Sequence, residues 1–434
     1  MSLKASEYGN KKVQEARQSK GWTIENPQPL LAASKILEPN SYSTEQSSFY
    51  AVSQATWRRF TEGKAVRSEN FKAFCQILDL DWRDICRGEE LFDLRREPQE
   101  SRCERTILQP ASLLRIKGPQ NMGKTRMLNR VLKQTRSTLN ENSHNLTRIA
   151  TVNFPRNFDL TVYDHLDRFL RSLCQTVAYQ LTKSNRSTHV SLVDSFEQDW
   201  DRLSGTPNHK ASVYFENQLL NLPLVLILED IDRVFEADFA TDFCDLIRGW
   251  HTEAQRDDLW QNLNLVIVHS TDVYASMDIG SSPLANLGEI VILEEFSSKD
   301  IESLVKQYNL DWDRRSTAKI MALVGGNPDL IDLALKTMVD ESTTLDLILS
   351  SATTEAGIYR DRLRKLWSII SLKPRLKAAL TDMISLVQTS RIDPLILHQL
   401  ESLGLVKIEA DRAAFRCELY HQYFTRLLTM EHNL

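Results

Sequence analysis

The sequence predicts an α/β protein whose core is a parallel sheet with helices on both faces, and that carries mainly helical domains before and after this core. Three observations lead to the prediction. Between residues 106 and 295, short apolar runs alternate with segments of helical spacing, as a parallel sheet with crossover helices requires. A glycine-rich turn joins the first of these runs to the helix that follows it. Outside this region, apolar residues recur mostly at helical spacing.

The glycine-rich turn at residues 118–125 lies between the predicted strand Leu113–Lys117 and the predicted helix Lys124–Leu139. Its spacing, G-x-x-x-x-G-K-T, is that of a phosphate-binding P-loop, and the flanking strand and helix disfavour a chance match. Backbone N–H groups and the positive end of the helix would face phosphate oxygens, with Lys124 as a cation and Thr125 as a hydroxyl ligand for Mg²⁺. We therefore predict that ATP and Mg²⁺ bind at Gly118, Pro119, Gln120, Asn121, Met122, Gly123, Lys124, Thr125 and Arg126.

A second motif follows the predicted strand Leu224–Leu228, a continuous apolar run of the kind that is buried on both faces of a parallel sheet. The run ends in Glu229-Asp230-Ile231-Asp232, a Walker B arrangement. Carboxylates at the carboxyl end of a central strand lie where a magnesium–phosphate group binds. We predict that Glu229 and Asp230 act with Thr125 at the metal and form the catalytic pair, and that Asp232 could substitute in part.

Ser270 and Thr271 follow the predicted strand Leu263–His269. Polar residues there would lie beside the phosphates and could sense the γ-phosphate; capping of the strand end is an equally good interpretation. The remaining predicted strands are Arg148–Phe154 and Ile290–Leu293. The remaining predicted helices of this domain are Tyr163–Ser184, a stretch around Val190–Leu203, Ser212–Leu220 and Ala237–Ala254.

Composition limits the classes of protein that remain. The 434 residues carry a net charge of −5, so any contact with nucleic acid would need a local basic patch. The 6 cysteines are scattered without a C-x-x-C pair, which indicates reduced thiols. No apolar segment approaches the roughly 20 residues that cross a bilayer, and the start of the chain lacks a signal-peptide core. We expect a cytoplasmic protein without a membrane partner.

Residues 1–90 have the pattern of a small helical domain that resembles the helix-turn-helix of phage-repressor-type regulators. Ser53 is a predicted N-cap, Trp57 and Phe60 share one face of the following helix, and Gly63 ends it. The alternative, a helical protein-interaction module, is about equally favoured. If the domain binds duplex DNA, its candidate contact residues are Gln54, Thr56, Arg58, Arg59, Lys64 and Arg67.

The remainder of the chain is mostly helical. Gly325-Gly326-Asn327-Pro328 ends one helix and starts the next. Near the end of the chain, the helices Leu376–Leu386 and Pro394–Leu403 precede a β-hairpin pattern, which is the order of a winged helix; a packing role without nucleic acid is the favoured interpretation. We predict a helix-turn-helix-like domain at 1–90, a linker at 91–105, a nucleotide-binding domain at 106–295, a helical lid at 296–358 and a winged-helix-like domain at 359–434.

Taken together, residues 106–430 resemble the AAA-like P-loop ATPase family common in cyanobacteria, which is related to the STAND signalling ATPases and to the AAA+ group. The resemblance implies a nucleotide-controlled switch or assembly protein, often in signalling or defence, with a protein partner or a nucleotide-dependent homo-oligomer. It also implies that the Gly-Gly-Asn-Pro corner, with Pro328, lies over the nucleotide. The motifs that carry the resemblance are residues 118–125, 226–235, 269–274, 325–328, 354–359 and 419–424.

The chain departs from this family at Glu229-Asp230, where the usual order is Asp-Glu. Asp230 would then act as the base although it is one methylene shorter, and a misplacement on the order of 1 Å can lower a rate about a hundredfold. We therefore expect ATP binding with slow hydrolysis. Arg233 and Arg248 are candidates for a trans-acting arginine by position only.

Two further functions stay open. One is an ATP-regulated DNA-binding regulator or transposition-type adaptor, in which the helix-turn-helix and the winged helix contact DNA. The other is a scaffold that binds ATP for folding alone. Salt-dependent binding to duplex DNA would distinguish the regulator from the switch, because neutralising phosphates makes binding steeply sensitive to salt.

Overall fold

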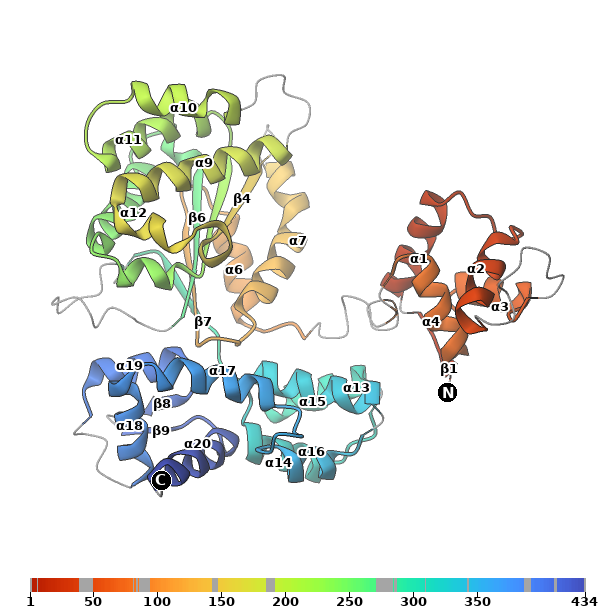
Figure 1. Cartoon of the computed structure of the whole chain (residues 1–434). Helices are drawn as coiled ribbons and strands as arrows, with labels where there is room; N and C mark the ends of the chain where they lie inside the picture. Colours follow the sequence, from red (N-terminus) through yellow and green to blue (C-terminus); the bar gives the residue numbers. More distant parts are fainter. Residues whose placement is uncertain are drawn as a thin grey trace. The chain divides into compact units, whose positions relative to one another are not determined.

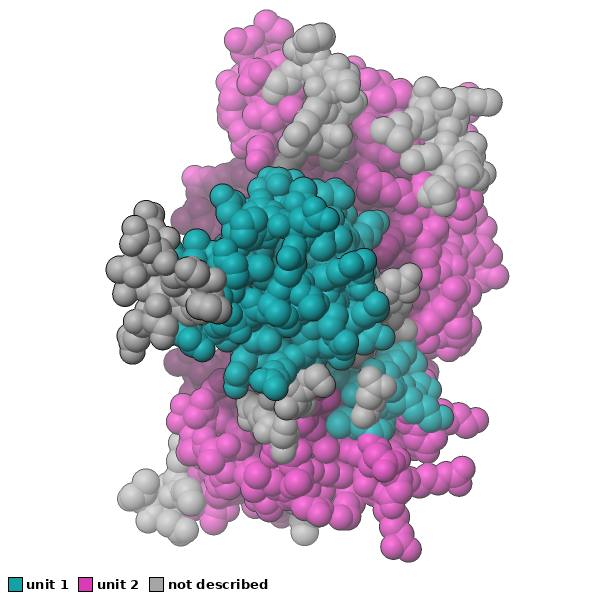
Figure 2. All heavy atoms as spheres, turned by 90° about the vertical axis from the view of Figure 1, so that its right-hand side faces the viewer, with its two compact units in different colours: residues 1–94, 303–310 teal, residues 95–302, 311–434 magenta. Residues whose placement is uncertain are grey.

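The computed structural model describes residues 2–5, 7–38, 50–80, 82, 85, 94–142, 147–184, 192–270, 284, 287–308, 310–341, 343–385, 392–409 and 412–432. The chain forms two compact units (Figure 2). The first consists of residues 1–94 with 303–310, and the second of residues 95–302 with 311–434.

The first unit is built around a cluster of aromatic side chains. Trp57 lies 5.1 Å from Phe74, and Phe60 lies 5.1 Å from Phe71, between ring centroids. The Ser53 hydroxyl accepts from the Thr56 N–H, which confirms the predicted N-cap. The elements of this unit are α1 (Glu7–Ser19), α2 (Gln28–Leu37), α3 (Gln54–Thr61), α4 (Ser68–Ile77), and the antiparallel pair β1 (Ser2–Leu3) and β2 (Val66–Arg67).

Helix α2 was not predicted, because prolines at 27 and 29 indicate an interruption in a sequence pattern. In the structure, Pro29 lies in the first turn of α2, where a missing N–H removes no helical hydrogen bond.

The second unit contains a five-stranded parallel sheet with the order β4-β5-β6-β3-β7. Strands β4, β6 and β7 of this sheet are labelled in Figure 1. The predicted α/β class with a parallel core sheet is therefore confirmed, and each of the five predicted strands is correct to within one residue at each end. The strands are β3 (Leu113–Lys117), β4 (Arg148–Asn153), β5 (Leu224–Glu229), β6 (Leu263–His269) and β7 (Glu289–Ile292).

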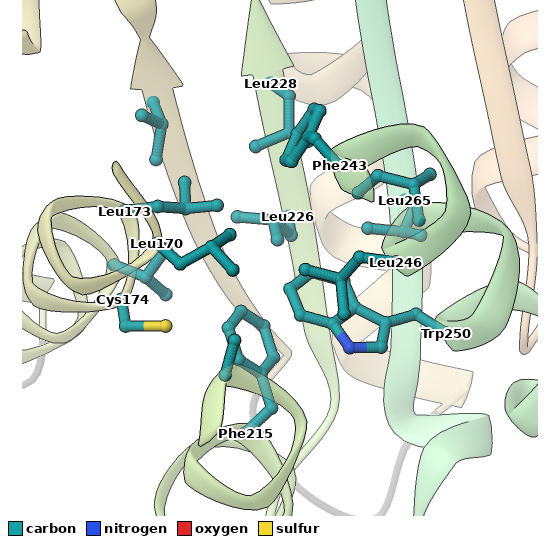
Figure 3. Close-up of a cluster of buried hydrophobic side chains, with 14 of the residues drawn as sticks. Leu170, Leu173, Cys174, Phe215, Leu226, Leu228, Phe243, Leu246, Trp250 and Leu265 are labelled. Atoms are coloured by element: carbon teal, nitrogen blue, oxygen red, sulfur yellow. The ribbon is translucent and has the colours of Figure 1, made fainter. Parts of the chain in front are cut away.

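Each face of the sheet has its own core, because alternate side chains of a strand point to opposite faces. Leu226 and Leu228 of β5 lie in one cluster, and Val225 and Ile227 lie in the other. Figure 3 shows the first cluster, in which α9 (Leu166–Ser184) and α12 (Ala240–Ala254) pack side chains against β5 and β6. The second cluster includes α7 (Lys124–Asn142) and α6 (Gln99–Ile107).

Part of the predicted linker at 91–105 is helical, because α6 includes residues 99–105. Cys103 and Ile107 are fully buried in the second cluster. The charged composition of this segment suggested a solvated linker, but only a narrow apolar face is needed to bury a short helix on the sheet.

Shorter elements connect the main ones. The predicted helix Ser212–Leu220 begins earlier than expected, at Pro207, where Thr206 caps it. The remaining elements of the sheet domain are α8 (Phe154–Asn157), η2 (Leu160–Asp164), α10 (Leu192–Arg202), α11 (Pro207–Tyr214), the π-helical η3 (Phe215–Leu219), η4 (Ile231–Glu236) and η5 (Trp260–Asn262).

After the sheet, the residues that the structure describes form helices and one hairpin, whose strands are β8 (Val406–Glu409) and β9 (Arg412–Phe415). Helices α18 (Pro374–Ile384) and α19 (Pro394–Ser402) precede the hairpin, and α20 (Glu418–His432) follows it. This order agrees with the predicted pattern, while the winged-helix interpretation and the domain boundaries remain predictions. The other helices are α13 (Ser298–Gln307), α14 (Arg314–Val324), α15 (Pro328–Glu341), α16 (Leu345–Ser351) and α17 (Arg360–Ser371).

Among the helices of the described ranges, none combines the length and the apolar character that a membrane crossing requires.

Candidate functional site

The candidate site begins with the loop between β3 and α7, at residues 118–123. A Cβ atom on Gly118 would lie 3.3 Å from the side chain and the carbonyl of Leu293, so glycine allows the loop to start close to the end of β7. Asn121 and Gly123 have left-handed backbones, with φ of 63° and 82°. Asparagine and glycine are the residues that adopt this conformation most readily. Helix α7 starts immediately afterwards, at Lys124, so its positive end faces the loop.

Lys124 lies folded inside this loop. Its Nζ donates to the carbonyl oxygens of Gly118 at 2.7 Å and Pro119 at 2.9 Å, and the residue is only 7% exposed. Burial lowers the pKa of Lys124, and the nearby carboxylates of Asp232 and Asp230 oppose that shift. The loop therefore holds a buried positive charge where the sequence predicts a phosphate contact.

The predicted metal ligands come together at the carboxyl ends of the strands. Glu229 is the last residue of β5 and is buried. Burial raises the pKa of Glu229 and the charge of Asp230 raises it further, whereas hydrogen bonds from Asn153 and Thr125 lower it. The Asn153 amide donates to Asp230 Oδ2 at 3.1 Å and to Glu229 Oε2 at 3.4 Å. Thr125, Glu229 and Asp230 thus belong to one hydrogen-bonded group.

Asn153 was missed in the sequence, although its position contains a usable signal. It is the last residue of β4, which pairs with β5 in parallel and in register with Glu229. A polar residue at the carboxyl end of a neighbouring parallel strand lies at the same edge of the sheet.

Asp232 and Ser270 connect the ends of β5 and β6. The Ser270 N–H donates to Asp232 Oδ1 at 2.9 Å, and the Ser270 hydroxyl donates to the same carboxylate. Burial raises the pKa of Asp232, and these hydrogen bonds oppose the shift. Ser270 is therefore held at the site through Asp232, while Thr271 lies outside the described residues.

His269, the last residue of β6, is buried beside these groups. Burial lowers its pKa to about 3, and the charges of Arg115, Lys117 and Lys124 add to the shift. His269 is therefore neutral at physiological pH and adds no positive charge to the site.

The donor set fits a magnesium–phosphate ligand. Thr125, Glu229 and Asp230 offer the hydroxyl and carboxylate oxygens that Mg²⁺ prefers. Loop N–H groups, the start of α7 and the Lys124 ammonium offer the donors and positive charge that phosphate oxygens require.

The Gly325-Gly326 corner packs tightly on the segment that follows β7. A Cβ atom on Gly326 would lie 2.2 Å from the Phe296 carbonyl oxygen, and the Phe296 N–H donates to the Gly326 carbonyl at 2.8 Å. Gly325 has a left-handed φ of 62°. The Asn327 side chain caps α15 by accepting from two backbone N–H groups, and Pro328 is buried at the start of that helix. Glycine is needed at 326 because the Cβ atom of any other residue would collide with the Phe296 backbone.

The turn between α19 and β8 contacts the first half of the loop. The Gln120 N–H donates to the Ser402 carbonyl at 3.1 Å. Gly404, with a φ of 78°, approaches so closely that a Cβ atom there would lie 3.5 Å from the Gln120 carbonyl. This contact was not predicted, because it joins residues far apart in the sequence through backbone atoms.

An ion-pair group holds the same C-terminal segment near the end of β7. Glu295 accepts from Lys407 Nζ at 2.7 Å and from Arg416 Nη1 at 3.2 Å. The Glu295 and Arg416 side chains are only 14% and 9% exposed, so solvent screens this pair weakly.

The candidate nucleic-acid residues lie around α3 in the first unit. Thr56 is half-buried, and the other five, Gln54, Arg58, Arg59, Lys64 and Arg67, are exposed. Arg58 and Lys64 both pair with Glu62, at 3.0 and 2.8 Å, which reduces the positive potential they present. In the second unit, Arg126, Arg233 and Arg248 are exposed.

Comparisons with known proteins identify a family for this chain. A family model described as an AAA-like domain matches residues 85–426. A stretch of 109 residues is 35% identical to an uncharacterized WD repeat-containing protein of Nostoc sp., and the match covers 24% of this chain but only 8% of that relative.

Solved structures are similar to this chain at low sequence identity. A Walker-type ATPase of Pyrococcus abyssi superposes with a TM-score of 0.54 and 14% identity, over 77% of this chain and 99% of that one. The ORC2 protein of Aeropyrum pernix, in its ADPNP–ADP complexes, gives a TM-score of 0.47 and 14% identity, over 80% and 98% of the two chains. The first similarity confirms the predicted P-loop ATPase fold.

We expect Glu229→Gln to stabilise the fold at neutral pH. Burial raises the pKa of Glu229 above its ordinary value of 4.5, so the folded state retains a proton that the unfolded state releases. Ionisation therefore opposes folding as the pH rises above that value, and a neutral amide removes the penalty. The gain in thermal midpoint should be present near pH 7 and should vanish near pH 4. Glu236→Gln, at an exposed position of η4, is the control and should show neither effect. A gain in thermal midpoint that is as large near pH 4 as near pH 7 would contradict the raised pKa of Glu229.

Proposed function

The chain belongs to the AAA-like domain family, and from this membership we propose that it binds magnesium-ATP and that the bound nucleotide controls how its C-terminal segment is held. The loop amides and Lys124 would bind the phosphates. Thr125, Glu229 and Asp230 would hold Mg²⁺, which would neutralise phosphate charge when bound. We interpret α18 to α20 with their hairpin as a winged helix that docks on the nucleotide domain.

The proposal of a switch rests on one hydrogen bond between the loop and the C-terminal segment. The Gln120 N–H belongs to the loop that phosphates would occupy, and it donates to the Ser402 carbonyl. A backbone N–H has a single hydrogen to donate, so a phosphate that recruits it must displace Ser402. Nucleotide in the loop and the C-terminal segment on the loop are therefore energetically coupled. This coupling supports a nucleotide-controlled change of conformation or assembly, in signalling or defence, with a protein partner or a second copy of the chain.

We propose that hydrolysis is slow. Asp230 is the shorter carboxylate in the position of the base, and its Oδ2 is already engaged by Asn153. Arg233 or Arg248 of a neighbouring copy could supply the positive charge that the loop lacks. Phosphate release by the wild type and by Asp230→Ala tests this proposal, and rapid turnover that survives the substitution would contradict it.

Lys124→Ala should weaken binding of magnesium-ATP about tenfold to a hundredfold, because a charge-assisted contact to phosphate contributes ~1.5–3 kcal/mol. Titration calorimetry on the full chain measures the affinity. Lys133→Ala, which removes an exposed lysine of the same helix, is the matched control and should bind like the wild type. Equal affinities of Lys124→Ala and the wild type would contradict the proposed site.

Glu295→Gln should release the C-terminal segment, which competes with phosphate for the Gln120 N–H, and should therefore slow the dissociation of bound ADP about tenfold, equivalent to ~1.4 kcal/mol. The reason is that the substitution removes the charge that holds Lys407 and Arg416. Stopped-flow release of a fluorescent ADP measures the rate. Glu355→Gln breaks the exposed pair with Arg364, whose side chains are 63% and 59% exposed, and should leave release unchanged. If both variants release ADP at the wild-type rate, the ion pair does not hold the segment.

A second candidate function is an ATP-regulated DNA-binding regulator or transposition-type adaptor. The exposure of Gln54, Arg58 and Arg59 on α3, opposite the buried Trp57 and Phe60, favours it. If it is correct, duplex DNA should bind with a steep negative dependence on salt. Replacing Arg58 and Arg59 together by alanine should abolish binding, whereas replacing the exposed Lys11 and Lys35 should not.

One experiment compares the two functions directly. Size-exclusion chromatography with light scattering, run with ADP, with ATP and with duplex DNA, reports assembly and DNA binding together. A change of mass with ATP alone supports the switch, whereas a shift with DNA supports the regulator. DNA that fails to bind even at low salt would eliminate the regulator.

A further inference from the structure

We propose that Arg96 is a positioning residue that connects the phosphate loop to residues 294–296, on which the Gly325-Gly326 corner packs. This inference rests on the proposed function, because it concerns how the nucleotide site and the corner influence each other. Arg96 Nη1 donates to the Met122 carbonyl at 2.8 Å, and Nη2 donates to the Glu294 carbonyl. The guanidinium also lies over the Phe296 ring, 4.8 Å from its centroid.

The contact with Met122 sets the direction of a loop N–H group. The Met122 carbonyl and the Gly123 N–H belong to one planar peptide unit and point in opposite directions. Gly123 has a φ of 82° and no side chain, so glycine itself restricts the rotation of this peptide only weakly. By holding the carbonyl on one side, Arg96 directs the N–H to the other.

The contacts with Glu294 and Phe296 extend the connection to the corner. The Phe296 N–H donates to the Gly326 carbonyl at 2.8 Å, and Gly326 packs against the Phe296 carbonyl without room for a side chain. Any shift of the corner therefore moves Phe296. Because the planar guanidinium contacts both residues 294–296 and the loop, we expect such a shift to reach the Met122–Gly123 peptide.

Arg96 is itself held in place from the other side. Its backbone N–H donates to Glu100 Oε1 at 2.6 Å. Glu100 is fully buried and accepts from Arg130 Nε at 2.8 Å. Arg130 lies on α7, the helix that starts at the phosphate loop. The backbone of Arg96 is thus linked through Glu100 to α7, the helix whose first turn would bind phosphate.

The neighbouring Arg95 provides a matched control. It is exposed, and its guanidinium pairs with Glu97 and Glu104, which belong to the same segment. Arg95→Ala removes the same charge without removing a contact to the loop. Arg96→Lys keeps the charge, but an ammonium lacks the planar fork that reaches two carbonyls at once.

The experiment combines calorimetry with hydrogen exchange on the full chain, with magnesium-ADP and magnesium-ATPγS as probes. In the wild type, exchange of the backbone amides at residues 290–298 should differ between the two nucleotides. In Arg96→Ala, nucleotide should still bind, with affinity reduced about tenfold, and the difference at 290–298 should disappear. Arg96→Lys should retain part of the difference, and Arg95→Ala all of it. A purely structural role would change the thermal midpoint without removing this nucleotide-specific difference.

Two results would overturn the inference while leaving the proposed function intact. One is a wild-type protein that binds both nucleotides without any difference at 290–298. The other is Arg96→Ala with the full wild-type difference. If Arg96→Ala does not fold, Phe296→Leu tests the same connection, because it removes the ring under the guanidinium but keeps an apolar side chain. If Phe296→Leu retained the full difference at 290–298, the inference would also be overturned. Absence of any heat on titrating the wild type would instead refute the proposed function itself.

Discussion

The buried ammonium of Lys124 is the constraint on which the rest of the site depends. A buried charge is unfavourable unless it is paired and hydrogen-bonded, and here two carbonyl oxygens of the loop lie at 2.7 and 2.9 Å. The loop can offer these carbonyls only by turning tightly, which is why Gly118 lies against Leu293 and Gly123 has a left-handed backbone. The carboxylates of Asp230 and Asp232 favour the charged form. A phosphate would replace the carbonyls with oxygens of full negative charge, so the loop is prepared for an anion.

The order of the strands explains why distant residues meet at this charge. β3 lies between β6 and β7, so the segments that follow both neighbours flank the loop that follows β3. β6 brings Ser270 toward Asp232 at the end of β5, and β7 brings Glu295 and Phe296 toward the loop and the corner. In a parallel sheet, the chain leaves all of these strands at the same edge. Topology thus places the proposed metal ligands after β5 on one flank of the loop and residues 294–296 on the other.

The sequence predicted what depends on local pattern. The strands, the P-loop and the carboxylates after β5 follow from apolar runs and spacing, and the structure places them as expected. The separate contacts made by Arg96, Glu295 and the Ser402 carbonyl were missed, because they join backbone atoms and single charges far apart in the sequence. Helix α6 was assigned to the linker because charged residues dominate it, although Cys103 and Ile107 are enough to bury it. Pattern shows which segments are buried, but it does not show which backbone carbonyls lie near an arginine.

The inverted order of the carboxylates fits the backbone that carries them. Asp230 has φ and ψ of 55° and 45°, a left-handed conformation in which aspartate is favoured over longer side chains. Its N–H donates to the Val268 carbonyl at 2.9 Å, so pairing with β6 fixes this turn. Glu229 is still within the strand, where its longer side chain reaches Thr125. The proposed metal ligands Glu229 and Thr125 are therefore in contact, whereas Asp230, the proposed base, is short and held by Asn153. From this asymmetry we infer that the backbone at 230 favours retention of the nucleotide over its turnover.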